Sequence, residues 1–149
     1  MNKKIVIIIC IILMICGIGY VIHSYPRWMY ESLMDEVGEL DTDQEKIELL
    51  NKARTYAEKA TISMGRINYR LASIYFKQAH ASFEQGEYAD AATAYEEIIN
   101  LDPLPEEERG KAKRGLVICY DWLRTQTLDK ALKQEYERKF NQLWEELMD

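Results

Sequence analysis

The sequence predicts an all-α protein, in which an apolar N-terminal helix precedes a domain of packed helices. Residues 5–22 carry no charged side chain and are nearly all apolar. From Thr42 onward the apolar residues recur with the helical period, and no alternating strand pattern is found. Gly and Pro fall only at a few points between these periodic segments. About 125 residues follow the apolar segment, which is enough for one domain with a hydrophobic core but too few for two.

The charge distribution excludes one class of partner. The formal net charge is -6, and the mean hydropathy of -0.35 conceals the contrast between the apolar segment and the rest. Lys3 and Lys4 precede the apolar segment, so the remainder of the chain is more acidic than the net charge states. Nucleic-acid binding depends on Lys and Arg side chains that neutralise phosphates, and we therefore expect no nucleic-acid partner.

The apolar segment predicts a membrane anchor. As a helix, residues 5–22 rise roughly 27 Å, which just spans the hydrocarbon core and would contact membrane lipid. Residues 1–4 are then a cytosolic tail, because their lysines outweigh the lone Arg27 beyond the span. We expect a juxtamembrane linker or short helix at 23–42, with a break at Pro26. The predicted location is a bacterial inner or plasma membrane, single-pass, with the C-terminal domain on the periplasmic or extracellular face.

Two alternatives to a retained signal anchor remain open. A cleaved secretory signal would end its apolar run at small residues, whereas here the run continues past Gly19. Residues 13–17 resemble a bacterial lipobox that would lipidate Cys16, although Ile15 stands where that motif has a small residue. Cys119 is the only cysteine after the apolar segment, so no disulfide can form within the domain, and we expect a buried structural thiol.

The first two helices of the domain are predicted from a cap and from two apolar stripes. Thr42 and Glu45 form a capping box that opens a helix at residue 43. Its expected buried stripe is Leu49, Ala53, Tyr56 and Ala60. After a turn around 61–65, a second helix is expected over 63–85, with a buried stripe of Ile67, Leu71, Ile74, Tyr75 and Ala79.

Three further helices follow at short intervals, which favours antiparallel neighbours. Gly86 ends the preceding helix, and the third helix runs to a stop at 100–103. Pro105 and the three glutamates after it suit the first turn of a fourth helix, whose stripe is Ala112, Leu116, Cys119, Tyr120 and Leu123. A last helix begins near Leu128, and its stripe is Leu132, Tyr136, Phe140, Leu143 and Leu147.

Residues 72–105 carry a fixed-spacing pattern across one helix-turn-helix unit. Its members are Tyr75, Ala79, Gly86, Tyr88, Ala91, Tyr95, Ile98 and Pro103. This pattern resembles the 34-residue tetratricopeptide (TPR) repeat. The resemblance implies that residues 43–149 form a short TPR-like α-solenoid of antiparallel helix pairs, with a degenerate unit at 110–143. About three repeats are usually needed for a stable array, so this domain is a candidate oligomer or subunit of a complex.

The resemblance also implies a function, because TPR domains bind peptides or partner helices in a groove lined by the first helix of each repeat. The expected groove helix carries a basic and aromatic stripe made of Arg66, Arg70, Ser73, Phe76, Lys77, His80 and Phe83. We therefore expect a protein partner with an acidic segment or a C-terminal carboxylate, and the alternative is a solvated helix face. A carboxylate clamp would be incomplete, since His80 stands where an Asn is expected.

A second candidate surface contains Trp122 and Trp144 on the last two helices, since aromatic side chains anchor many interfaces. Packing in the core is the alternative for both.

We expect no enzyme, and no catalytic, cofactor-binding or metal-binding residues. The chain has two histidines and contains no Gly-rich phosphate loop or hydrolase elbow. The predicted function is a membrane-anchored TPR scaffold or adaptor that mediates protein–protein interaction in a cell-envelope complex. The alternatives are a chaperone-like periplasmic binder of exported chains and a structural subunit of a larger membrane complex.

Overall fold

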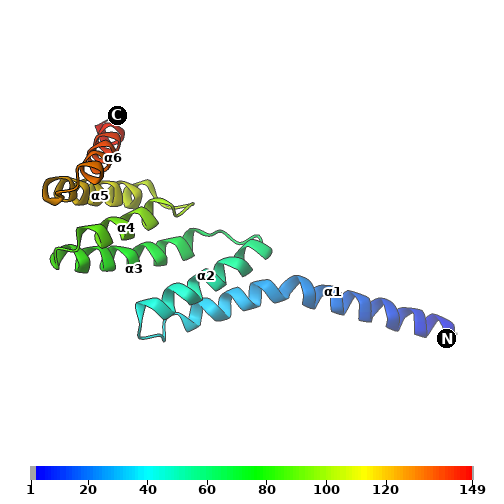
Figure 1. Ribbon diagram of the computed structural model, residues 1–149. Helices are drawn as coiled ribbons and strands as arrows, with labels where there is room; N and C mark the ends of the chain where they lie inside the picture. The colour runs from blue at the N-terminus through cyan, green and yellow to red at the C-terminus, as the bar shows by residue number, and fades with distance from the viewer. Residues whose placement is uncertain (1–2, 149) are drawn as a thin grey trace. The chain divides into compact units, whose positions relative to one another are not determined.

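The computed structural model describes residues 3–148, with side chains from Met14 onward. The regular secondary structure of this part of the chain is entirely α-helical, without strands. The helices in order are α1 (Lys3–Glu36), α2 (Asp43–Lys59), α3 (Gly65–Glu84), α4 (Tyr88–Ile99), α5 (Glu106–Gln126) and α6 (Lys130–Met148) (Figure 1). The predicted all-α fold is confirmed. The helices fall into two compact units, Met1–Met64 and Gly65–Asp149.

The first unit is a hairpin of α1 and α2. The C-terminal part of α1 buries Tyr30, Leu33, Met34 and Val37, and α2 packs against α1. The predicted break at Pro26 is wrong, because α1 continues through this proline to Glu36. Most of the segment expected as a linker or short helix at 23–42 therefore belongs to a long helix.

The membrane prediction is also corrected. Within the residues that the structure describes, no helix is both long and apolar enough to cross a membrane. The side chains of residues 1–13, which include the predicted tail and half of the predicted span, lie outside the described residues. The absence of such a helix contradicts the anchor at 5–22 and the single-pass location.

The cap of α2 forms as predicted, whereas its buried face was predicted only in part. The Thr42 hydroxyl accepts a hydrogen bond from the Glu45 backbone N–H at 3.2 Å and donates one to the Glu45 carboxylate at 2.7 Å. The residues that α2 buries completely are Leu50, Ala53 and Ala57. Of the expected stripe of Leu49, Ala53, Tyr56 and Ala60, Ala53 is therefore correct, and the other three residues are only partly buried.

The second unit stacks α3 to α6 so that each helix packs on the next, and α5 also contacts α3. Its core contains predicted residues from three helices: Ala79, Ala91, Ile98, Ala112, Leu116, Cys119 and Tyr120. The terminal helix α6 differs from the others, because it has no fully buried residue. The unit is a repeat-like stack of helices that is compatible with an α-solenoid.

The connections of this stack follow the predicted turn chemistry. Gly86 has a positive φ of 80°, and Glu87 N–H donates to the Ser82 carbonyl at 2.9 Å, which closes the end of α3. Between α4 and α5, Leu101 and Leu104 are buried. The fully buried Asn68 of α3 donates a hydrogen bond from Nδ2 to the Pro103 carbonyl at 3.1 Å. This bond fixes the α4–α5 connection against α3.

Candidate protein-binding surfaces

The polar residues of the predicted stripe lie along the outside of α3. Arg66, Ser73, Lys77 and His80 are exposed, and Arg70 is half-buried. His80 Nδ1 lies 3.6 Å from a carboxylate oxygen of Glu84, one turn further along the helix. The spacing predicted from the sequence thus places these side chains on one face of α3.

The two phenylalanines of the stripe pack inward. The Phe76 ring meets the Tyr95 ring of α4 edge-on, with 6.2 Å between the centroids. The Phe83 ring meets the Tyr88 ring in the same way at 5.1 Å. Both rings are partly buried, so they contribute to the packing of α3 on α4 more than to the exposed stripe.

Two surfaces that were predicted separately meet at Tyr88. The Trp122 ring of α5 stacks on Tyr88 at 5.3 Å, with 6° between the ring planes, while Phe83 contacts the same tyrosine. Trp122 keeps 44% of its surface exposed. The second predicted tryptophan, Trp144, belongs to α6, where it stacks on Phe140 at 5.9 Å and is 50% exposed.

The exposed face of α5 adds residues that the sequence analysis did not select. Lys111, Arg114 and Ile118 are exposed and follow one another at helical spacing toward Trp122. α5 contacts α3 directly, and it also packs on α4, where Trp122 stacks on Tyr88. We call the combined surface the α3–α5 face; it consists of Lys77, His80, Lys111, Arg114, Ile118 and Trp122. The sequence did contain a signal for these α5 residues, namely the degenerate unit at 110–143, in which α5 is the first helix of a repeat.

Local acidic residues partly neutralise this face. Lys111 Nζ lies 2.9 Å from Glu107 and 3.0 Å from Glu108 in the first turn of α5. The hydrogen bond from Lys111 lowers the pKa of Glu107 below its usual value. Trp122 and Ile118 add exposed apolar surface to the α3–α5 face, beside its charged side chains.

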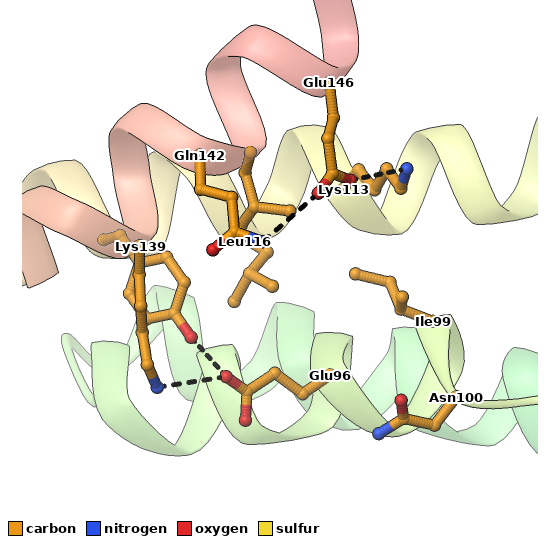
Figure 2. A pocket seen from close by; sticks show the side chains of 10 residues that line it. Glu96, Ile99, Asn100, Lys113, Leu116, Lys139, Gln142 and Glu146 are labelled. Atoms are coloured by element: carbon orange, nitrogen blue, oxygen red, sulfur yellow. Dashed lines mark hydrogen bonds and ion pairs between the residues drawn. The ribbon is translucent and has the colours of Figure 1, made fainter.

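A separate cleft lies between α4, α5 and α6, with a volume of about 320 Å³ (Figure 2). Ile99, Leu116 and Leu143 are its aliphatic lining. Two groups of charged side chains bridge neighbouring helices at its rim, and Figure 2 shows them at different edges of the cleft. The sequence analysis missed this cleft, because its walls come from three helices whose charged partners are far apart in the chain.

At one edge, the Glu96 carboxylate accepts a hydrogen bond from the Tyr120 hydroxyl, and Lys139 Nζ lies 3.5 Å from the same oxygen. Burial, followed by the bond to Glu96, raises the pKa of Tyr120. At the other edge, Lys113 Nζ lies 2.9 Å from Glu146, and this hydrogen bond lowers the pKa of Glu146. These pairs connect α6 to α4 and α5.

The described residues also bear on whether the chain has a metal site or a reactive thiol. Among them, no three His, Cys, Asp or Glu residues gather where they could hold a metal ion. Cys119 is fully buried, and burial raises the pKa of its thiol from 9.0 to about 11, so the thiol stays protonated at neutral pH.

The fold and its surfaces define a class of protein: an all-helical, repeat-like stack with exposed faces of mixed basic and aromatic character. Comparisons with protein-family models, with curated proteins and with solved structures give no match for this chain.

Proposed function

We propose that this chain is a TPR-like scaffold or adaptor whose α3–α5 face binds an acidic segment of a partner protein. The proposal is carried by two observations: α5 contacts α3, and each of these helices exposes cationic side chains, which on α5 share a helix face with Ile118 and Trp122. Aromatic and aliphatic anchors surrounded by charges are typical of protein interfaces. The resemblance of residues 72–105 to a TPR repeat supports the same surface.

The charge of the whole chain favours an acidic partner at this position. The net charge of -6 repels an acidic segment from most of the surface, whereas Lys77 and Arg114 attract it. Such long-range charge effects steer association and set orientation more than they add affinity. The apolar contact with Trp122 then supplies the part of the binding energy that salt does not screen.

Site-specific crosslinking tests the proposal. A photo-crosslinking amino acid at His80 or at Ile118 is expected to capture the same small set of partners, in fixed ratios. The matched control replaces Lys133, an exposed lysine of α6 outside this face. Capture of many unrelated chains, or equal capture from all three positions, would show a non-selective binder and overturn the proposal.

A further inference from the structure

The cleft between α4, α5 and α6 has the size and lining of a small binding site. Its volume of about 320 Å³ is at the lower end of the range for ligand pockets, about 300–1,000 Å³. Leu116 at its base is buried, while Ile99 and Leu143 are partly exposed at its walls. A cleft of this size fits one amino-acid residue better than a large cofactor.

The charges around the cleft select an uncharged occupant. Lys139 is paired with Glu96 and Lys113 with Glu146, so the rim carries no net charge. The side chain of Lys113 is only 20% exposed. A charged occupant would have to displace one partner of an existing pair and leave the other uncompensated in a partly desolvated place. An aliphatic side chain covers the lining without disturbing either pair.

Two carboxamide side chains line the cleft beside the aliphatic residues. Asn100 lies at the C-terminal end of α4, and Gln142 lies on α6. A carboxamide offers both a donor and an acceptor, which matches the N–H and C=O groups of a peptide. Gln142 makes one long hydrogen bond, 3.5 Å to Glu146, and so keeps capacity for another partner.

We propose that this cleft binds an extended peptide segment through one aliphatic side chain of leucine or isoleucine size, with Asn100 and Gln142 contacting the adjoining peptide groups. The inference does not rest on the α3–α5 face, because Leu116 and Ile118 project to opposite sides of α5. Since α6 has no fully buried residue, an occupant that contacts Leu143 also adds to the packing that holds α6.

A minimal probe tests this site in the full chain. N-acetyl-leucine amide is the probe, because it has an uncharged aliphatic side chain between two peptide groups. N-acetyl-glycine amide is the control, because it has the same peptide groups without the side chain. Titration of protein with ¹³C-labelled Ile and Leu methyl groups should give saturable shifts at Ile99, Leu116 and Leu143 with the leucine compound only. Amide hydrogen exchange in α6 should slow at saturation.

The variants Asn100→Ala and Gln142→Ala separate the peptide contacts from simple hydrophobic adsorption. Both residues are exposed, so the fold should persist, and combining the two changes should weaken binding several-fold. Gln134→Ala, at another exposed position of α6, is the control and should bind as the unchanged protein does. Equal shifts with the glycine compound, shifts that do not saturate, or unchanged binding by the double variant would each overturn the proposal.

Discussion

The ring of Tyr95 on α4 fills the space beside the backbone of Gly115 on α5. A β-carbon added at Gly115 would lie 2.4 Å from Cζ of Tyr95. The same ring packs edge-on against Phe76 of α3. Tyr95 therefore connects three helices, and Gly115 is the residue that lets α5 approach α4 closely.

The first prediction is that Gly115→Ala destabilises the protein, although Gly to Ala normally favours a helix by about 1 kcal/mol. Overpacking against Tyr95 should lower the free energy of unfolding by about 1–3 kcal/mol. Gly110→Ala in the same helix is the control, since its nearest neighbour is the flexible Arg114 side chain at 3.5 Å. Denaturant unfolding followed by circular dichroism measures both. Equal stability of the two variants would contradict this account of the contact.

The second prediction concerns the hydrogen bond from Tyr120 to Glu96. Tyr120→Phe keeps the ring that stacks on Tyr136 and should cost about 1 kcal/mol of unfolding free energy. Tyr136→Phe is the control, because Tyr136 is partly exposed and its ring is likewise retained. If both substitutions lower the free energy of unfolding by the same amount, the hydrogen bond from Tyr120 to Glu96 contributes nothing specific to stability.

The third prediction is that Cys119 resists thiol reagents in the folded protein. Iodoacetamide at pH 8 should modify the exposed Cys16 and leave the buried Cys119 unmodified until denaturant is added, as peptide mass spectrometry can show. The unfolded thiol loses its proton near pH 9.0 and the folded one only near pH 11. The folded state therefore gains free energy of unfolding from keeping the Cys119 thiol protonated. This contribution is fully present below pH 9 and is lost between about pH 9 and 11. Rapid labelling of native Cys119 would disprove its burial.

The fourth prediction concerns the cap of α2. Thr42→Ala removes the hydroxyl that accepts from Glu45 N–H and should destabilise the start of the helix by about 1 kcal/mol. Faster amide hydrogen exchange in the first turn of α2 is the expected readout. Thr55→Ala, within the same helix, should leave that turn unchanged, and an equal effect of both variants would argue against the cap.

The sequence predicted the domain helices well wherever local chemistry decides the outcome. The cap at Thr42 and the stop at Gly86 depend on neighbours a few residues away, and the helical period indicated the buried Ala91 and Ile98. The buried face of α2 was predicted correctly at Ala53 but not at Leu50 and Ala57, because the period alone does not say where the packing partner lies. That partner is the C-terminal part of α1, which the sequence analysis assigned to a linker or short helix.

The surfaces were predicted less well, because they too depend on where the packing partner of each helix lies. Helical spacing placed Lys77 and His80 on one face, but it could not show that Phe76 turns toward Tyr95. The pairing of Lys113 with Glu146 depends on how α6 returns along α5. The cleft between α4, α5 and α6 therefore has no local signal in the sequence.

The most direct test of the scaffold proposal is the affinity of a crosslinked partner segment for a charge-reversed α3–α5 face. The double variant Lys77→Glu, Arg114→Glu should bind at least about tenfold more weakly, a loss of about 1.4 kcal/mol or more, with a larger difference at low salt. Lys133→Glu, which makes the same kind of change on α6, should bind within about twofold of the unchanged protein. Equal affinity of the folded double variant and this control would contradict the proposal that the α3–α5 face is where the partner binds.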